Sequence, residues 1–534
     1  GVTQLQVGAP RAAAPASAAG ATYGPAVAAR FAEPSTQYST PGLAPERRGF
    51  TTNSELGQWL HNIANAAPRG PTQASVLQLG ASQQGEPILG LLLTRAKGMD
   101  MASLEANGRS TVVLIGQQHG DEPAGSEALL VVARELAQGL LEPLLDRINV
   151  VVIPRANPDG ATNGNRTTAN GVDMNRDHLL LNTPEARALA RVVRDYRPIL
   201  VLDAHEFTVA GRYLQKFNAI QRYDALLQYT TTANYHEFLT KASQEWYHQP
   251  MLGALQSQGM SSEWYYTTST QPDDKRISMG GVQPDTGRNV NGLKNAVSLL
   301  VETRGVGLGR LHIQRRVHTQ VTTITSALRS TAERAADLEQ VRSYVARDTA
   351  SRACKGQVVI EAQATPMQRE LTMLDPDTGA DRTLKVDWNS SLALRPVKSR
   401  PRPCGYWLAA HATAAVERLQ MLGVQVLRIA EPGALLADTY HETARETTER
   451  TDVRGTIAGG SSIIRTQVTP VRSAIDVPAG SFYVPLNQGL AHLAVAALEP
   501  DTQSSYFANR LIDELGSTAR VMTVPSLVFE ESDE

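Results

Sequence analysis

Residues 111–130 read TVVLIGQQHGDEPAGSEALL, and this stretch decides the fold class. A mostly apolar run leads to Gly116, and a helix-like pattern begins a few residues later. This order is typical of a buried strand that passes into a helix in an α/β sheet. His119, Asp121 and Glu122 follow the predicted strand directly. Because open α/β folds bind their ligands at strand ends, these polar side chains indicate a functional site.

The flanking segments alternate between strand-like and helix-like patterns. Further strands are predicted at 148–153 (INVVVI), 199–205 (ILVLDAH) and 296–302 (AVSLLVE). Helices are predicted at about 123–139 and from residue 183, with a long polar helix at about 311–348. This alternation predicts an α/β fold, in which a mixed twisted sheet carries helices on both faces.

Three regions differ in composition along the chain. Residues 1–47 are rich in Ala, Pro and Gly without a sustained period, which predicts a linker or an arm on the domain surface. Residues 48–349 hold the alternating pattern of the predicted α/β domain. Residues 350–534 contain short strand-like runs and one helix-strand piece, which predict a smaller, strand-rich C-terminal domain of unknown role.

Composition and charge exclude several classes of protein. With 534 residues, 42% of them hydrophobic, the chain can bury at least one large core. The 51 basic and 53 acidic residues nearly cancel, so the charge gives no reason to expect a nucleic acid partner. No apolar run approaches the ~18 residues of a membrane-spanning helix, so no membrane span is predicted. The oligomeric state stays open.

The start of the chain and its cysteines bear on the cellular compartment. The Ala- and Pro-rich leader resembles segments that follow an export signal, which predicts a periplasmic or secreted protein, with a cytoplasmic location as the alternative. The chain has two cysteines, Cys354 and Cys404. A structural disulfide and a pair of buried free thiols both fit the sequence.

Four groups able to bind a metal or carry a proton lie at predicted strand ends. His119 and Glu122 follow one strand, His205 follows another, and Glu302 ends a third. Two imidazoles and one carboxylate form a catalytic zinc set, because they leave the fourth position of the metal open. A closed structural site would need four protein ligands, usually including thiolates.

Five motifs, in order and at matching spacing, resemble those of the carboxypeptidase A family of zinc exopeptidases. They are HGDE at 119–122, NPDG at 157–160, ANGVDMNR at 169–176, DAHE at 203–206 and LLVETRG at 299–305. The resemblance covers roughly residues 50–310, and the HGDE form resembles the bacterial branch of this zinc metallocarboxypeptidase family. It implies that residues 48–349 form a catalytic domain with a zinc carboxypeptidase-like fold.

The resemblance also implies the residues of the reaction centre. His119, Glu122 and His205 correspond to the zinc ligands, which hold one Zn²⁺ per chain. Glu302 corresponds to the general base that activates water. Arg166 corresponds to the arginine that polarises the scissile carbonyl group. The implied reaction is hydrolysis without a covalent intermediate.

The resemblance implies a peptide substrate with a free C-terminus. Asn175 and Arg176 correspond to the clamp on the terminal carboxylate. The tyrosine that covers the substrate corresponds to Tyr265 or Tyr266, and the sequence does not decide between them.

The stretch before Glu302 is expected to line the pocket for the substrate side chain. Asp285 in this stretch would favour a basic side chain, whereas Arg288 would favour an acidic one. The preferred substrate therefore stays open.

The favoured function is a zinc-dependent hydrolase that removes C-terminal amino acids from peptides. One alternative is a zinc-dependent deacylase of N-acyl amino acids, similar to succinylglutamate desuccinylase or aspartoacylase, or an amidase acting on peptidoglycan peptides. The second alternative is a non-catalytic binding protein in which the C-terminal domain is the working part.

Overall fold

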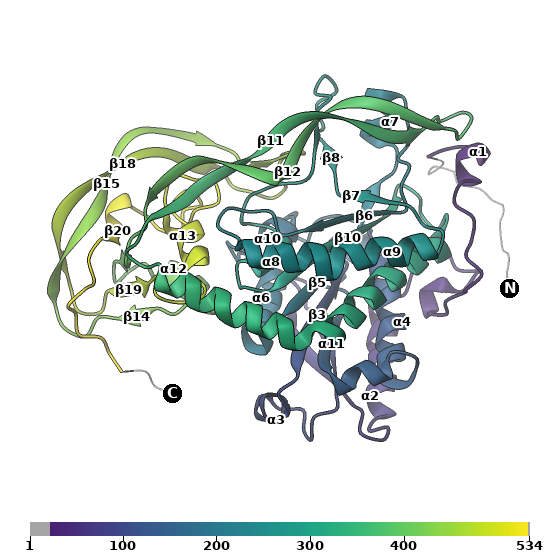
Figure 1. Ribbon diagram of the computed structural model, residues 1–534, viewed down its shortest axis with the longest axis horizontal. Helices are drawn as coiled ribbons and strands as arrows, with labels where there is room; N and C mark the ends of the chain where they lie inside the picture. The colour runs from purple at the N-terminus through teal and green to yellow at the C-terminus, as the bar shows by residue number, and fades with distance from the viewer. Residues whose placement is uncertain (1–21, 532–534) are drawn as a thin grey trace.

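The computed structural model describes residues 22–531 of the chain. Figure 1 shows an α/β part at one end of the molecule and a strand-rich part at the other. The long helix α11 (Ile313–Ser351) runs from one part to the other. The long strands β11 (Gln357–Leu374) and β12 (Asp381–Pro401) extend from the strand-rich part back over the α/β part.

A mixed sheet forms the centre of the α/β part. Within residues 22–531 it has eight strands, in the order β1-β2-β4-β3-β5-β10-β6-β7. The four central strands, β4, β3, β5 and β10, are parallel, whereas β2 and β6 pair with them in antiparallel fashion. The strands, in sheet order, are β1 (Gln73–Ala81), β2 (Pro87–Thr94), β4 (Ile148–Ile153), β3 (Ser110–Gly116), β5 (Leu200–Thr208), β10 (Val297–Val306), β6 (Ala225–Tyr229) and β7 (Ser262–Trp264).

Helices cover both faces of this sheet because successive strand residues point to opposite sides. Val112 and Leu114 of β3 face a core with α2, α4, α9 and α11, whereas Val113 and Ile115 face a second core with α3 and α6. Among the described helices, none is long and apolar enough to span a membrane. The helices of this part, besides α11, are α2 (Asn53–Asn65), α3 (Met101–Asn107), α4 (Ala124–Gln138), α5 (Pro158–Asn163), α6 (Pro184–Tyr196), α7 (Gly211–Phe217), α8 (Glu237–Ala242), α9 (Gln249–Ser257) and α10 (Gly287–Gly292).

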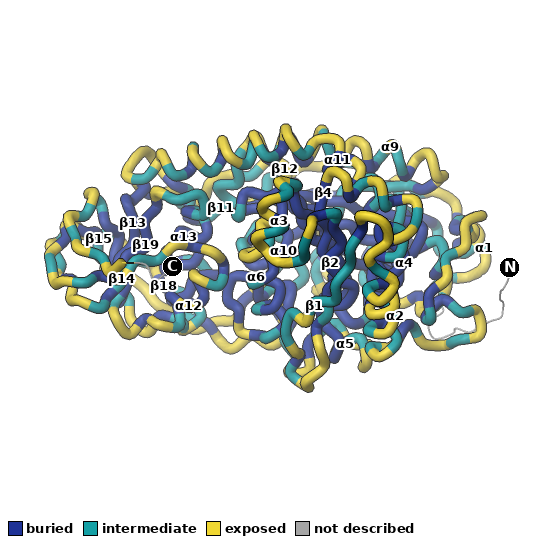
Figure 2. The backbone as a smooth tube through the Cα atoms, turned by 90° about the horizontal axis from the view of Figure 1, so that it is seen from below, coloured by how far each residue is buried: buried dark blue, intermediate teal, exposed yellow. Residues whose placement is uncertain are grey.

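The predicted fold class is confirmed for the α/β part. The stretch at 111–130 forms most of β3, a buried turn and the first half of α4. All seven residues of β3 are buried, as expected for a central parallel strand covered on both faces. In Figure 2 the dark blue, buried backbone concentrates at the sheet, while α11 alternates between buried and exposed turns along the outside.

The described part of the predicted arm, residues 22–47, packs against the α/β part. It contains the short helix α1 (Pro25–Ala28), and Val27 and Phe31 are buried in a cluster with side chains of the α/β part. The guanidinium of Arg304 lies 3.6 Å from the centre of the Phe31 ring, which is close enough for a cation–π contact. The preceding part of the predicted arm, residues 1–21, lies outside the described residues.

Residues after α11 form the second, strand-rich part. Strands β11 and β12 pair along their length and join two short strands, β9 (Ile277–Ser278) and β8 (Thr267–Thr268), of the α/β part. A separate sheet contains β14 (Leu427–Arg428), β19 (Phe482–Pro485), β13 (Gly405–Leu408), β20 (Thr518–Val521), β15 (Gly433–Thr448) and β18 (Ile463–Val477). The remaining elements are the helices α12 (Thr413–Met421) and α13 (Ala491–Leu498) and the hairpin strands β16 (Thr451–Asp452) and β17 (Gly455–Thr456).

The two parts of the chain share buried contacts. One hydrophobic cluster joins Leu179 and Ala186, near the start of α6, to Leu419, Val484 and other residues of the strand-rich part. The guanidinium of Arg418 donates a 2.6 Å hydrogen bond to the carbonyl oxygen of Leu180. The domain boundary near residue 350 stays a prediction, and these contacts fix the second part against the first.

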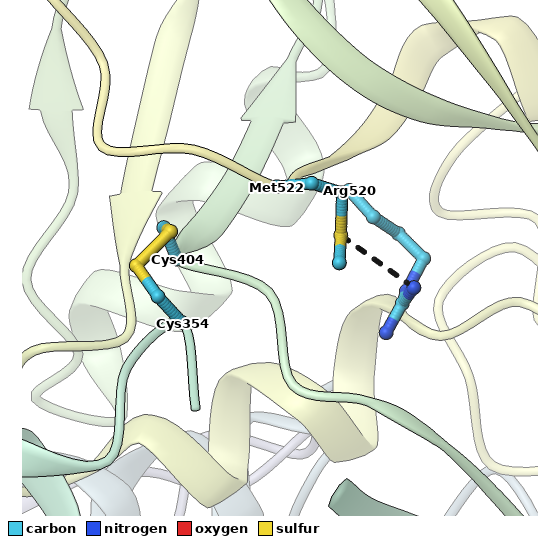
Figure 3. The surroundings of a disulfide bond; sticks show 4 residues. All are labelled: Cys354, Cys404, Arg520 and Met522. Carbon is cyan, nitrogen blue, oxygen red and sulfur yellow. Dashed lines mark hydrogen bonds between the residues drawn. A yellow bond between two sulfur atoms is a disulfide. The ribbon is translucent and has the colours of Figure 1, made fainter. Parts of the chain in front are cut away.

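Cys354 and Cys404 form a disulfide, so the pair left open by the sequence is bonded. Figure 3 shows the bond near Arg520 and Met522, and the two cysteines lie just before β11 and just after β12. The disulfide closes the loop that contains both long strands. Structural disulfides are typical of oxidising compartments, which agrees with a periplasmic or secreted location, although that location stays a prediction.

Candidate metal and active site

The turn after β3 and the C-terminal halves of β5 and β10 bring the candidate residues together. His119 and Glu122 follow β3, and His205 and Glu302 lie directly opposite each other on the parallel strands β5 and β10. Gln117, the first residue after β3, has a φ of 50°, so the chain turns sharply there before reaching His119. Parallel strands place their C-terminal ends at the same edge of the sheet, which explains why residues far apart in sequence meet here.

His119, Glu122 and His205 form a buried cluster of potential metal ligands. The Nδ1 atom of His119 lies 2.8 Å from Oε2 of Glu122, and Nδ1 of His205 lies 3.1 Å from Oε1 of the same carboxylate. One donor atom from each side chain lies within 4.8 Å of the others. Two imidazole nitrogens and a carboxylate fit zinc and leave room for a further ligand.

Two aspartates that sequence analysis missed lie behind the imidazoles. The Nε2 atom of His119 lies 2.8 Å from Oδ1 of Asp173, and Nε2 of His205 lies 2.9 Å from Oδ2 of Asp203. A carboxylate at the outer nitrogen fixes the ring of a metal-binding histidine and leaves the other nitrogen for the metal. This arrangement leaves both Nδ1 atoms facing Glu122. It therefore supports the assignment of the cluster to a metal.

Sequence signals for both aspartates were present. Asp173 lies within the ANGVDMNR motif. Asp203 lies two residues before His205 on β5, so both side chains are on the same face of the strand. The role of Asp173 could not be inferred from its position alone, because its partner His119 lies 54 residues earlier.

Glu302 lies in the pocket wall but outside the metal cluster. Its side chain is buried at 8% exposure. Burial raises the pKa of Glu302 to about 7, against the opposing effect of the nearby His205. A carboxylate whose pKa lies near neutrality can accept and return a proton at neutral pH.

Arg166 reaches the metal cluster from the side. Its Nη2 atom lies 2.9 Å from Oδ2 of Asp173, and its Nη1 atom lies 3.7 Å from Oε2 of Glu122. The ion pair with Asp173 holds the guanidinium beside His119 and Glu122. A positive charge is therefore fixed next to the candidate metal position.

Asn175 and Arg176 lie on a 3-10 turn, Met174–Arg176. Oδ1 of Asn175 accepts a 2.9 Å hydrogen bond from the backbone N–H of Gly287, which fixes this side chain against α10. Nη1 of Arg176 donates a hydrogen bond to the carbonyl oxygen of Asn175, and its Nε donates to Oδ2 of Asp452 at 2.8 Å. Arg176 is thus held from two sides.

The two candidate tyrosines have different surroundings. The hydroxyl group of Tyr266 donates to Oε1 of Gln221 within a hydrophobic cluster. Tyr265 packs beside Gly280, where an added Cβ would lie 2.9 Å from the tyrosine ring. Burial raises the pKa of Tyr265 to about 12, and the negative charge of Glu302 adds to this shift. Both tyrosines line the pocket, and the choice between them stays a prediction.

Asp285 and Arg288 are already engaged with other protein groups. Oδ2 of Asp285 lies 3.0 Å from Nη2 of Arg450, in an ion pair with both side chains buried. Nη1 of Arg288 donates to the carbonyl oxygen of Tyr229 and to Oγ1 of Thr231. Selection of the substrate by either residue stays a prediction.

A pocket of about 110 Å³ joins these groups. Three residues that sequence analysis did not predict, Asp452, Val453 and Arg454, also line it. They come from the β16–β17 hairpin of the strand-rich part, and no local pattern indicated their place. All of the predicted site residues line the same pocket: His119, Glu122, Arg166, Asn175, Arg176, His205, Tyr265, Tyr266, Asp285, Arg288 and Glu302.

Fold and site together define a mixed α/β protein with a buried His-Glu-His cluster suited to zinc. Residues 57–278 match the family model described as zinc carboxypeptidase. The chain therefore contains a zinc carboxypeptidase domain, which makes it a hydrolase. The match includes the three metal-site residues and ends before Glu302.

Relatives and solved structures carry the same description. Carboxypeptidase 2 of Trichophyton rubrum is 28% identical over 399 residues, covering 74% of this chain and 72% of that protein. Carboxypeptidase 2 of Trichophyton equinum is 26% identical over 482 residues, covering 88% of this chain and 87% of that protein. A crystal structure of carboxypeptidase A from Helicoverpa armigera is 14% identical with a TM-score of 0.40, covering 56% of this chain and 78% of that one. The bacterial HGDE branch stays a prediction.

Proposed function

We propose that the protein removes amino acids one at a time from the free C-terminus of peptides. The observation that carries the proposal is the position of Arg176, which lines the same pocket as the His119, Glu122 and His205 cluster. A planar guanidinium can bind a carboxylate through two parallel hydrogen bonds. A terminal carboxylate held there would bring the last peptide bond to the metal cluster.

In this proposal one zinc ion per chain is held by His119, Glu122 and His205, with Asp173 and Asp203 orienting the two imidazoles. A zinc ion bound there polarises the substrate carbonyl and lowers the pKa of its water towards ~7. The metal cluster is buried, so bulk water has limited access to it.

Glu302 acts as the general base and acid. Its carboxylate accepts a proton from the attacking water and later delivers that proton to the departing amine nitrogen. Burial supports this role because it raises the pKa of Glu302 towards neutrality. Arg166 places a positive charge where negative charge develops on the carbonyl oxygen, a type of contact whose loss costs about 100- to 1,000-fold in rate.

The substrate end is held by Arg176 together with Asn175, and Tyr265 closes over it. Arg176 contributes most to binding the terminal carboxylate, because its guanidinium is positively charged and planar.

Paired peptides test the direction of attack. Free-acid peptides should lose residues one at a time, whereas C-terminally amidated copies should be poor substrates. Arg176→Lys should lower kcat/KM on free-acid peptides by about tenfold or more, because lysine cannot form the bidentate contact. Mass spectrometry of timed digests with the zinc-loaded protein reports both results.

The same digests separate the alternatives. Equal cleavage of amidated and free-acid peptides, or cleavage within the chain, would contradict the carboxypeptidase proposal. Hydrolysis of N-succinyl or N-acetyl amino acids without peptide cleavage would favour a deacylase, and cleavage restricted to peptidoglycan peptides would favour an amidase. The non-catalytic alternative does not agree with the presence of a zinc carboxypeptidase domain.

A further inference from the structure

The segment at 450–459, which includes the β16–β17 hairpin, is fixed to the α/β part around the pocket. The backbone N–H of Thr270 donates to the carbonyl oxygen of Arg454, and that of Asp173 donates to the carbonyl oxygen of Ala458. The guanidinium of Arg450 donates to the carbonyl oxygen of Arg176 at 2.8 Å. These contacts hold the hairpin in place as a wall of the pocket.

Asp452 presents a carboxylate in a fixed orientation to Arg176. Its Oδ1 accepts hydrogen bonds from the backbone N–H groups of Arg454 and Gly455, so the turn of the hairpin orients the carboxylate. Its Oδ2 accepts from Nε of Arg176 at 2.8 Å, and each side chain is 12% exposed. Both carboxylate oxygens are therefore occupied by protein donors.

The ion pair with Asp452 uses only one edge of the Arg176 guanidinium. Nε binds Asp452, and Nη1 uses one hydrogen for the carbonyl oxygen of Asn175. Within residues 22–531, Nη2 of Arg176 has no hydrogen-bond partner. The fork formed by Nη1 and Nη2, which can bind a carboxylate in the bidentate manner, thus keeps donors for a substrate.

We propose that Asp452 is a positioning residue, which holds Arg176 so that the open fork of its guanidinium receives the terminal carboxylate of the substrate. This inference rests on the proposed role of Arg176. It means that the strand-rich part completes the active site. A freely rotating arginine side chain would have to be ordered during substrate binding, and Asp452 removes that cost beforehand.

The test measures KM and kcat of the full-length, zinc-loaded protein on a neutral free-acid peptide. Asp452→Ala should raise KM about tenfold or more, because a charged hydrogen bond to a half-buried arginine is lost, while kcat changes little. Asp452→Asn keeps the size and one acceptor oxygen and should raise KM less. Glu449→Gln, an exposed change just before this segment, is the control and should leave KM unchanged.

The direction of the change in KM tests the positioning role of Asp452. An unchanged KM, or a lower KM that would show Asp452 competing with the substrate, would overturn the proposal, as would a fall in kcat alone. Thermal unfolding and zinc content of each variant identify a folding defect, in which case Asp452→Asn supplies the result. If the unaltered protein cuts amidated peptides equally well, the proposed function fails, whatever the variants do.

A second observation concerns Arg454, the other charged residue that the hairpin adds to the pocket. Within the described part of the chain, its side chain has no acidic partner and no hydrogen bond. Arg212, also in the pocket lining, bonds only to the carbonyl oxygen of Thr268. Burial and the positive charges of Arg166 and Arg212 lower the pKa of Arg454, which agrees with cations gathered at one side of the pocket.

We propose that Arg454 binds an acidic side chain within the last two residues of the substrate. Three arginines around the pocket are paired with carboxylates: Arg166 with Asp173, Arg176 with Asp452, and Arg450 with Asp285. Arg212 and Arg288 instead donate hydrogen bonds to carbonyl or hydroxyl oxygens of the protein. Arg454 lacks such a partner, so a substrate carboxylate would supply the missing charge. This inference also rests on the proposed function, since it names the substrate class.

Matched peptides with Glu or Gln at the last or the penultimate position test this selection. The protein should prefer Glu over Gln at one of these positions, and Arg454→Gln should lower that ratio of kcat/KM values about tenfold. Arg395→Gln, which removes an exposed charge from β12, is the control and should keep the ratio. Absence of a preference for Glu at both positions, or a ratio unaffected by Arg454→Gln, would overturn the proposal. In either case the rate on neutral free-acid peptides reports the basic activity separately.

Discussion

Glu302→Gln is expected to lower kcat on free-acid peptides by about 100-fold or more, the usual size of a general-base effect. Glutamine keeps the shape of the side chain and its capacity for hydrogen bonds, but its amide cannot accept the proton of the attacking water. Glu302 lies outside the His119, Glu122 and His205 cluster, so the variant should still bind zinc. Single-turnover rates and metal analysis of the same preparation measure both effects.

The control separates loss of the base from a general effect of the substitution. Glu370 is exposed on β11, away from the pocket, and Glu370→Gln makes the same chemical change there. This variant should have normal activity. Near-normal turnover of Glu302→Gln would show that another group accepts the proton, and loss of zinc from that variant would show that Glu302 supports the metal.

The fold of the α/β part could be predicted because its pattern is local. The apolar run before Gly116, the helix after it and the strands that contain His205 and Glu302 each follow from short-range periodicity. The two strands continue further than predicted, to Thr208 and Val306. The order of the strands in the sheet was harder to predict from the sequence, because β10 lies beside β5 although almost a hundred residues separate them. Nothing in a local pattern specifies such a pairing.

The long strands of the second part were predicted as several short ones. Pro366 interrupts the pattern of β11, and Pro470 interrupts that of β18. Proline lacks the N–H that an inner strand needs, but it is tolerated on an edge strand. Both β11 and β18 are edge strands of their sheets, so each continues through its proline.

Some residues of the candidate site could likewise be predicted from the sequence, and others could not. Its metal cluster could be predicted because its members follow β3 or lie in the C-terminal half of β5, and parallel strands bring these parts together at one edge of the sheet. The hairpin residues Asp452 and Arg454 could not be predicted as part of the site, because Asp452 contacts a residue, Arg176, that lies 276 positions earlier in the sequence. Only the folding of the second part over the first creates this contact.

A variant that lacks one imidazole tests the metal assignment. His205→Ala should abolish stoichiometric zinc binding and, with it, peptidase activity. The remaining ligands, His119 and Glu122, would form a two-ligand site, whereas catalytic zinc sites use three protein ligands. Asp203→Asn should be milder, with about a 10- to 100-fold loss in zinc affinity, because His205 stays but loses its orienting charge.

Metal content and activity must change together for this assignment to hold. Zinc is measured after dialysis against a weak chelator, and activity is measured before and after zinc is added back. The unaltered protein should hold one zinc per chain, lose activity with a strong chelator and recover it with zinc. His441→Ala, which removes an exposed histidine of β15, should behave like the unaltered protein. Because the imidazole of His205 lies in the buried cluster and that of His441 does not, full zinc content in His205→Ala would place the metal elsewhere and refute the ligand set.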